Sequence, residues 1–280
     1  MIKVVFIGGL TNGKIVYNYL VKNKFVDLLM TITYPDTVDK PRFVKFPNNS
    51  KVIKSEKAND KLNIIKQLKP DYIFVAGWSE LLTNEILNIP VKGTIGFHPS
   101  KLPNDRGRSV LAWQIEDGYS ETALSMFYYN EIPDEGDIIA SEPIKIEVND
   151  YINDVLDKVD AATYNLMYAY FPLLRNDRAP RKKQNLNEGN FRRLRKEIDS
   201  IIDWNKNSNA IYNKIRAISS PYPGARGLID KIQYTVWESE VVDTFPFGEN
   251  EAPGTLIAKL YDNSLIVKTR DSFLRVLKYE

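Results

Sequence analysis

The first 178 residues alternate between short apolar runs and segments in which apolar residues recur at helical spacing. The apolar runs are rich in β-branched residues, as is typical of strands covered on both faces, and they occupy residues 2–7, 28–33, 52–53, 71–76 and 91–97. Helical spacing is found in residues 15–20, 59–68, 80–87, 110–117 and 155–174. Two further strands are expected at 122–129 and at 138–146, where Pro143 suggests a sheet edge. Strands that alternate with helices predict an α/β fold with a doubly wound, mostly parallel, Rossmann-like sheet.

The pattern changes after residue 178. The segment that follows has few aliphatic residues and many basic ones. Its basic residues, counted from position 178, are Arg178, Arg181, Lys182, Lys183, Arg192, Arg193, Arg195 and Lys196. Such a segment is either a solvated surface linker or a site for a polyanion.

From Trp204 the hydrophobic pattern restarts. Ile211, Ile215 and Ile218 mark a helix, and short alternating runs at 234–237, 255–261, 264–269 and 273–277 predict strands. We therefore expect three parts: an N-terminal catalytic domain over 1–178, a linker over 179–203, and a small helix-plus-β module over 204–280, a truncated OB-like β structure.

The composition narrows the class only a little. At 43% hydrophobic and 26% charged residues, the chain resembles ordinary soluble globular proteins. The net charge of +2 argues neither for nor against nucleic acid. The absence of cysteine excludes disulfides and thiolate metal sites, and it fits a reducing cytoplasm. No run approaches the roughly 20 apolar residues of a membrane span, so we expect a cytoplasmic protein with no membrane partner.

Candidate chemistry is concentrated between Thr94 and Asp137. His98 is the only histidine of the chain, and it follows directly on the predicted strand 91–97. Open α/β sheets bind their ligands at the carboxyl ends of strands, and imidazole is the side chain that most readily exchanges protons near neutral pH. Carboxylates follow at Asp134, Glu135 and Asp137. The alternative is a single histidine that only packs.

A glycine-rich turn at residues 8–14 suggests two nucleotide motifs, and it fits neither. The phosphate-binding P-loop requires Ser or Thr after its lysine to hold magnesium, but Ile15 follows Lys14. The dinucleotide fingerprint fails because Leu10 takes the place of its second glycine. We interpret the segment as a tight turn between strand and helix; nucleotide binding there is a weaker alternative.

The remaining chemistry is acid–base catalysis by the histidine with a carboxylate to orient it. The chain has no thiol, and the G-x-S-x-G pentapeptide of serine hydrolases does not occur. A histidine that removes a proton, together with a donor for an oxyanion, suits acyl transfer to an amine. Arg106 and Arg108 offer guanidinium groups for a phosphate or carboxylate, unless they are plain surface arginines.

Several motifs then resemble those of the folate-dependent formyltransferases. These are His-Pro-Ser-x-Leu-Pro from His98, Arg-Gly-Arg from Arg106, and Glu-Gly-Asp-Ile-Ile from Glu135. The resemblance continues with Ile-Asp-Trp at 202–204, Pro-Tyr-Pro-Gly-Ala at 221–225 and Pro-Gly-Thr at 253–255, so it spans most of the chain. It implies that the formyl donor is 10-formyl-tetrahydrofolate and that no metal takes part.

The resemblance also implies roles for individual residues. The catalytic positions are His98 and Asp137. The positions expected at the folate are Trp78, Leu81, Leu82, Ile132, Glu135 and Gly136. The positions expected at the acceptor substrate are Ser100, Lys101, Arg106 and Arg108.

One position departs from the family pattern. Relatives carry an asparagine two residues before the histidine, where its amide stabilises the oxyanion, and this chain has Gly96. We expect either a substitute donor, from a backbone N–H, Ser100 or Asn104, or a protein that binds without turnover.

The resemblance is strongest to the sugar N-formyltransferases, because of the Arg-Gly-Arg motif followed by Leu111-Ala112-Trp113. It implies a nucleotide-diphosphate amino-deoxysugar as acceptor, in the synthesis of surface glycans such as lipopolysaccharide, and a homodimer. Methionyl-tRNA formyltransferase is the alternative enzyme, with tRNA the less favoured partner. A non-catalytic folate or nucleotide-sugar binding protein is the alternative of another class.

Overall fold

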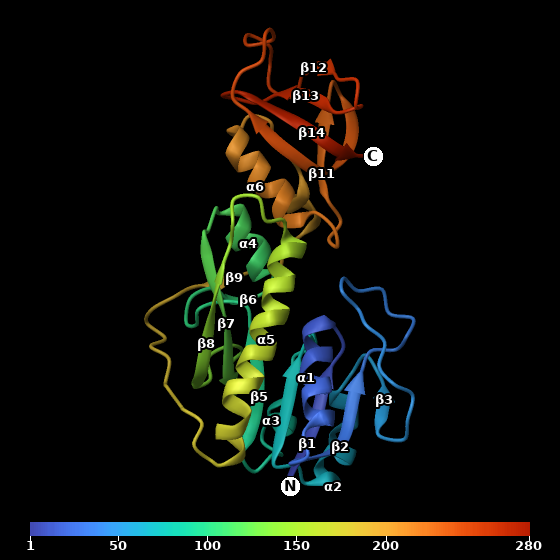
Figure 1. Ribbon diagram of the computed structural model, residues 1–280, viewed down its shortest axis with the longest axis vertical. Coiled ribbons are helices and arrows are strands. Elements are labelled where there is room, and N and C mark those ends of the chain that lie inside the picture. Colours follow the sequence, from blue (N-terminus) through green and yellow to red (C-terminus); the bar gives the residue numbers. More distant parts are fainter. The chain divides into compact units, whose positions relative to one another are not determined.

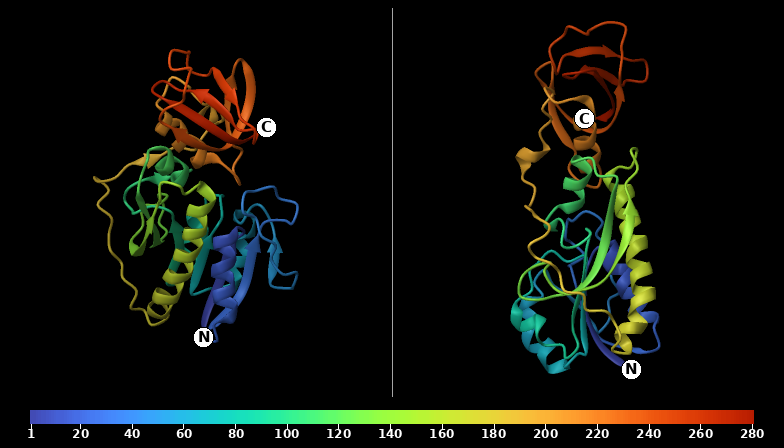
Figure 2. Two further views of the ribbon diagram at one scale, coloured as in Figure 1. Left: turned by 45° about the horizontal axis from the view of Figure 1, so that its top comes forward. Right: turned by 90° about the vertical axis from the view of Figure 1, so that its left-hand side faces the viewer.

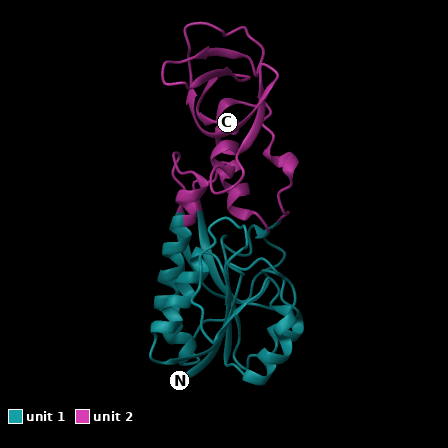
Figure 3. Cartoon of the chain, turned by 90° about the vertical axis from the view of Figure 1, so that its right-hand side faces the viewer, with its two compact units in different colours: residues 1–107, 122–144, 157–191 teal, residues 108–121, 145–156, 192–280 magenta.

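A seven-stranded sheet organises the first of two units that the chain forms (Figure 3). The computed structural model describes residues 1–280. Unit 1 comprises Met1–Gly107, Thr122–Ile144 and Asp157–Phe191, and unit 2 comprises Arg108–Glu121, Lys145–Leu156 and Arg192–Glu280. Each unit is built from separate stretches of sequence, and the boundaries at 178 and 203 stay a prediction about domains.

The strands of unit 1 follow the order β3-β2-β1-β4-β5-β7-β8. Their bounds are β1 (Ile2–Gly8), β2 (Val26–Thr33), β3 (Val52–Lys54), β4 (Tyr72–Ala76), β5 (Gly93–His98), β7 (Glu121–Tyr128) and β8 (Ile138–Lys145). β1 to β5 pair in parallel, and β7 runs antiparallel to β5. The predicted mostly parallel, doubly wound sheet is therefore confirmed, with β8 and its Pro143 at the edge.

Helices cover both faces of this sheet. They are α1 (Thr11–Lys22), the 3₁₀ turn η1 (Asn59–Lys61), α2 (Leu62–Leu68), α3 (Asn84–Leu87), and α5 (Ile152–Arg175), whose first residues, up to Leu156, belong to unit 2. Figures 1 and 2 show α1 and α5 on one face and α2 and α3 on the other. The central strands β1 and β4 are buried between these layers, with Phe6, Ile7, Ile73 and Phe74 fully enclosed.

The predicted helix at 80–87 is wrong in its first half, because α3 begins only at Asn84. The Glu80 carboxylate accepts hydrogen bonds from the Ala58 N–H and from the Asn59 amide, at 2.6 and 2.9 Å. The Asn59 side chain in turn accepts the Thr83 N–H at 3.0 Å. These bonds hold residues 80–83 in a non-helical loop, which their apolar spacing could not reveal.

The basic segment after α5 is held to the protein by hydrogen bonds. Lys182 and Ile138 exchange two backbone hydrogen bonds, of 2.8 and 3.0 Å. Farther on, β9 (Phe191–Arg192) pairs with β6 (Arg106–Gly107) as a two-stranded sheet. The turn η2 (Glu197–Ser200) follows. This segment, residues 179–203, is therefore an ordered strap that pairs with residues 106–107 and with Ile138.

Unit 2 contains α4 (Val110–Glu116), α6 (Ser208–Ile218) and a five-stranded antiparallel sheet. Its strands are β10 (Ala225–Ile229), β11 (Ile232–Val242), β12 (Leu256–Lys259), β13 (Leu265–Lys268) and β14 (Phe273–Tyr279), in the order β10-β11-β14-β13-β12. The Asn207 side chain caps α6 by accepting the Ala210 N–H at 2.7 Å. The predicted helix-plus-β module is confirmed, and β10 is a strand that the sequence pattern did not reveal. No helix of the protein is both long and apolar enough to cross a membrane.

Candidate active site

His98 is the last residue of β5, and its buried imidazole is held at both nitrogens. Nε2 lies 2.8 Å from the carbonyl oxygen of Asp105. Because a carbonyl only accepts, Nε2 carries a hydrogen and donates it. Nδ1 lies 3.4 Å from Oδ1 of Asp134. These two contacts fix the orientation of the ring and place Nδ1 beside a carboxylate.

Asp134 is positioned by main-chain contacts. It has a positive φ of 62°, uncommon for a residue with a side chain, and its Oδ2 accepts the Gly107 N–H at 2.9 Å. The Gln184 amide donates to the carbonyl oxygens of Asp134 and Gly136, at 2.8 and 2.7 Å. The strap after α5 therefore secures the loop that carries the carboxylate.

The structure pairs His98 with Asp134, three residues before the predicted Asp137. Asp137 lies where the chain enters β8, and its carbonyl oxygen accepts the Tyr128 N–H at 2.9 Å. Its negative charge contributes to raising the pKa of Tyr128, after burial as the main cause. Between Asp134 and Asp137, Gly136 passes so close to the Tyr128 carbonyl that a Cβ would lie 1.7 Å from its oxygen.

The loop after His98 is closed by a second residue of the strap, Asn190. Its side-chain oxygen accepts the Asp105 N–H at 2.8 Å, its amide donates to the Asp105 carboxylate at 2.9 Å, and its carbonyl accepts the Arg106 N–H at 3.0 Å. Asn190 thus fixes the residue whose carbonyl holds His98. Neither Asn190 nor Gln184 was a candidate from the sequence, because each lies far along the chain from its partners, among basic residues without a motif.

The predicted acceptor residues fall into two groups. Arg106 is buried, pairs with the Glu135 carboxylate at 2.6 Å and stacks on Phe191 at 4.2 Å. Arg106 and Glu135, predicted for the acceptor and the folate, therefore hold each other. The exposed side chains of Lys101 and Arg108 have no hydrogen bond or ion pair in the structure.

Ser100 is fully buried, and its hydroxyl donates to the Asn104 carbonyl at 2.6 Å. The Ser125 hydroxyl donates to the Ser100 carbonyl at 2.6 Å. The side chain of Ser100 thus fixes the shape of the loop and has no exposed surface with which to contact a substrate.

Two of the residues predicted for the folate, Trp78 and Leu82, pack against an apolar cluster in unit 1. Trp78 stacks on Tyr34 with ring centroids 4.2 Å apart, and both Trp78 and Leu82 pack against the core beneath β1 and β4. Leu81 and Ile132 expose 71% and 53% of their surface. They are therefore available for an apolar ligand. No group of three or more acidic or histidine side chains is arranged to hold a metal ion.

Tyr129 occupies the place of the asparagine that is absent at Gly96. A Cβ on Gly96 would lie 2.0 Å from Cε1 and 2.6 Å from Cζ of the Tyr129 ring, so no side chain fits at position 96. Residues 96 and 98 are two apart in β5 and so face the same side of the sheet. The Tyr129 ring therefore lies on the same side as the His98 imidazole.

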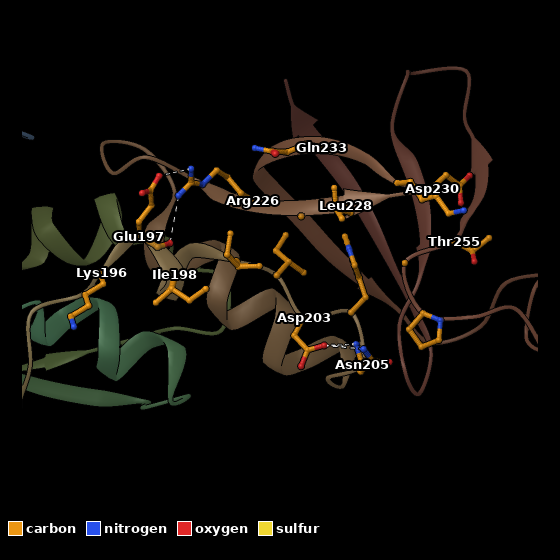
Figure 4. A pocket seen from close by; sticks show the side chains of 17 residues that line it. Lys196, Glu197, Ile198, Asp203, Asn205, Arg226, Leu228, Asp230, Gln233 and Thr255 are labelled. Atoms are coloured by element: carbon orange, nitrogen blue, oxygen red, sulfur yellow. Dashed lines mark hydrogen bonds and ion pairs between the residues drawn. The ribbon is translucent and has the colours of Figure 1, made fainter.

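A separate groove lies within unit 2 and contains none of the predicted site residues (Figure 4). It has a volume of about 1100 Å³ and is lined by residues of the strap, β10 and the Trp204 region. Arg226 and Glu197 form an ion pair of 2.8 Å at one end. The Trp204 indole N–H is buried there without a partner.

Comparison with known proteins gives a consistent picture over the whole chain. The family model described as Formyl transferase matches residues 2–170, and that described as Formyl transferase, C-terminal domain, matches residues 194–280. Methionyl-tRNA formyltransferase of Mycoplasma capricolum subsp. capricolum is 28% identical over 100% of this chain and 90% of its own length.

Two solved structures share the fold. An N-formyltransferase from Helicobacter canadensis, in complex with folinic acid and dTDP-3-aminofucose, matches with a TM-score of 0.73 and 21% identity over 99% of each chain. HypX from Aquifex aeolicus in complex with tetrahydrofolic acid matches with a TM-score of 0.72 and 15% identity, over 98% of this chain and 43% of HypX. This chain therefore spans less than half of the HypX length.

Proposed function

Because the chain belongs to the formyl transferase family, we propose that it transfers the formyl group of 10-formyl-tetrahydrofolate to an amine. The observation that carries this proposal is the His98–Asp134 pair at the carboxyl end of β5. A buried imidazole with one nitrogen fixed by a carbonyl and the other beside a carboxylate is suited to accept a single proton at Nδ1.

The donor supplies a carbonyl carbon that is attacked by the amine. As the new C–N bond forms, the carbonyl electron pair moves onto oxygen, and His98 Nδ1 takes a proton from the amine nitrogen. Asp134 stabilises the resulting imidazolium. When the carbonyl re-forms, the bond to N10 of the folate breaks, and His98 returns its proton to that nitrogen. Atoms and charge balance, and no further reactant is needed.

The residues present fit a folate. A pterin ring needs a flat apolar surface, and unit 1 supplies the half-buried side chains of Trp78 and Leu82 and the exposed side chains of Leu81 and Ile132. Glu135 and Gly136 would contact the folate through main-chain atoms, because the Glu135 carboxylate is paired with Arg106.

For the acceptor we propose a nucleotide-diphosphate amino-deoxysugar, with Lys101 as a cation for the diphosphate. The full-length match to a sugar-bound N-formyltransferase supports this choice. So does the state of the basic strap, because four of its arginines are engaged within the protein. Arg192, Arg193 and Arg195 pair with Asp117, Asp199 and Glu116, and Arg181 stacks on Tyr128.

The charged initiator tRNA is the second candidate acceptor. It is favoured by the 28% identity to the Mycoplasma methionyl-tRNA formyltransferase over the whole of this chain. The C-terminal family model covers residues 194–280, so the size of the β module does not distinguish the two acceptors.

The test is formyl transfer from 10-formyl-tetrahydrofolate, followed by release of tetrahydrofolate, on a panel of nucleotide-linked amino sugars and on methionyl initiator tRNA. Turnover on one sugar, lost in His98→Ala, supports the proposal. Formylation of the tRNA alone would favour the second candidate. Folate binding without turnover on any amine would leave a non-catalytic binding protein.

A cytoplasmic homodimer that feeds surface glycan synthesis, lipopolysaccharide included, completes this proposal. Light scattering of the purified protein, with and without folate, measures the oligomeric state directly.

A further inference from the structure

The carbonyl oxygen of a formyl group becomes an oxyanion when an amine attacks it, and a hydrogen-bond donor must face it. Glycine at position 96 has no side chain to serve. Among the donors first considered from the sequence, Ser100 is already committed within the loop. The Ser100 hydroxyl donates to the Asn104 carbonyl, and the Ser100 N–H donates to the His98 carbonyl at 2.9 Å. Asn104 is exposed.

Tyr129 lies where such a donor is required. Its backbone N–H donates to the Thr94 carbonyl at 2.8 Å, which places it beside β5 just beyond the end of β7. The ring atoms that cover Gly96 most closely are Cε1 and Cζ, and Cζ bears the hydroxyl. The polar end of the ring, rather than its base, therefore lies over the position of the missing side chain.

The surroundings of the ring link the two halves of the site. Tyr129 packs against the same apolar cluster as Trp78 and Leu82, where we place the folate. It contacts Phe127 with ring centroids 5.1 Å apart. The negative charge of Asp134, the partner of His98, contributes to raising the pKa of the Tyr129 phenol. The ring thus lies between the proposed donor surface and the catalytic pair.

The hydroxyl of Tyr129 is available for a ligand. It makes no hydrogen bond to the protein, and the half-buried side chain does not enclose its oxygen completely. Burial, and to a smaller extent the charge of Asp134, raise the pKa of Tyr129 far above its ordinary value. A phenol is protonated near neutral pH even at its ordinary pKa of about 10, so this hydroxyl can act as a donor.

We propose that the Tyr129 hydroxyl replaces the family's asparagine as the hydrogen-bond donor to the oxyanion formed at the formyl carbon; this inference rests on the proposed formyl transfer. As the amine nitrogen attacks, the carbonyl π pair moves onto oxygen, and the phenolic O–H donates a hydrogen bond to it without giving up its proton. The proton balance stays with His98 Nδ1. Gly96 is then required, because the ring that carries the donor excludes any Cβ there.

The test is Tyr129→Phe, which keeps the ring and removes only the donor. We expect kcat to fall by about 100- to 1,000-fold, as on loss of one oxyanion donor, with the KM for 10-formyl-tetrahydrofolate little changed. Tyr128→Phe is the matched control. Its hydroxyl belongs to a neighbouring ring that lies under Arg181, and its loss should leave turnover within about twofold.

A double variant tests whether Tyr129 acts as a hydrogen-bond donor or only packs. Tyr129→Ala opens the space over Gly96, and adding Gly96→Asn to this variant restores the amide of the relatives. The double variant should recover at least about tenfold over Tyr129→Ala, as expected when one oxyanion donor is regained. Gly96→Asn alone should lose activity, because its Cβ would collide with the Tyr129 ring.

The outcomes separate the inference from the proposed function. Wild-type turnover that persists within about twofold in Tyr129→Phe overturns the role of Tyr129 and leaves formyl transfer intact. Absence of wild-type turnover on every amine overturns both. Tetrahydrofolate binding and thermal unfolding, measured on each variant, show whether a loss of rate reflects a misfolded protein.

Discussion

His98 Nδ1 faces Asp134 Oδ1 across 3.4 Å, and Asp134 reaches this place because its other oxygen is held by the Gly107 N–H. The separation exceeds a normal N–H···O hydrogen bond. It suits a pair that tightens when Nδ1 accepts a proton, since the attraction between imidazolium and carboxylate then draws them together. His98 ends β5, whereas Asp134 lies in the loop between β7 and β8.

The first prediction concerns this carboxylate. Asp134→Asn keeps the size of the side chain and removes the charge that stabilises the imidazolium, so kcat should fall by about 100-fold or more. Asp137→Asn is the control at the position that the sequence motif favoured, and it should retain most of the activity. Steady-state formyl transfer on both variants measures the difference. A larger loss in Asp137→Asn would restore the assignment made from the sequence.

The difference between Asp134 and Asp137 shows what a linear pattern can reveal. The alternation of apolar runs located β1, β4 and β5, because burial on both faces leaves a strong mark on composition. His98 could be found for the same reason, as the polar residue that ends such a run. Among three carboxylates within four residues, however, the choice depends on a positive φ at Asp134 and on the close passage of Gly136. Neither is visible in hydrophobicity.

Tyr129, Gln184 and Asn190 illustrate a second limit. Each acts on the site through contacts with residues distant in sequence, and each lies outside a motif. The sequence pattern predicts a linker over the strap, because this segment has few aliphatic residues. Its order comes instead from hydrogen bonds and ion pairs, which periodicity does not register. In the sequence, only Gly96 in place of the family's asparagine indicated that a hydrogen-bond donor is missing. Tyr129 could be identified as its replacement only from the fold.

The second prediction tests the strap. Asn190→Ala removes the side-chain bonds to Asp105, the residue whose carbonyl holds His98 Nε2. We expect the free energy of unfolding to fall by about 1–2 kcal/mol. We also expect kcat to fall more than stability alone explains, because the imidazole loses its fixed orientation. Asn187→Ala, an exposed residue of the same strap whose side chain makes no hydrogen bond, is the control for both chemical unfolding and kinetics.

Unaltered kinetics in Asn190→Ala, together with the expected loss of stability, would mean that the loop after His98 is held by its backbone alone. If kcat falls no further in Asn190→Ala than in Asn187→Ala, the side chain of Asn190 likewise has no part in orienting His98.

The third prediction concerns the buried pair of Arg106 and Glu135, whose side chains are only 5% and 10% exposed. Glu135→Ala leaves the guanidinium without its counter-charge, and it should lower the free energy of unfolding by about 3–5 kcal/mol. Glu131→Ala, on an exposed residue of the same loop, should change it by less than about 0.5 kcal/mol. Denaturant titrations of the two variants measure the free energies of unfolding, which can be compared if their dependence on denaturant concentration has the same slope in both.

Folate affinity separates this structural role from the one inferred by resemblance. If the Glu135 carboxylate binds the folate directly, Glu135→Gln should lose affinity while remaining well folded. If it serves mainly to hold Arg106, loss of affinity should accompany loss of stability in both variants.

The fourth prediction concerns the alkaline limit of unit 2. The Tyr151 hydroxyl donates to the Ser239 carbonyl and accepts the Ser239 N–H, each at 3.0 Å. Burial is the main cause that raises the pKa of Tyr151 to about 12, from 10 in the unfolded chain. A group whose folded pKa is raised contributes stability that is present below the unfolded pKa. That contribution should therefore be complete below pH 10 and should be lost as the pH rises from 10 to about 12.

Tyr151→Phe cannot ionise, and it lacks both hydrogen bonds to Ser239. It should be less stable than the wild type near neutral pH, by about 1–3 kcal/mol. The difference should shrink as the pH rises through this window, because the wild type alone loses stability by ionising Tyr151. Free energies of unfolding for both proteins, measured at intervals between pH 8 and pH 12 at constant ionic strength, test the sign of this trend. A difference that stays constant or grows with pH would show that Tyr151 does not resist ionisation in the folded protein.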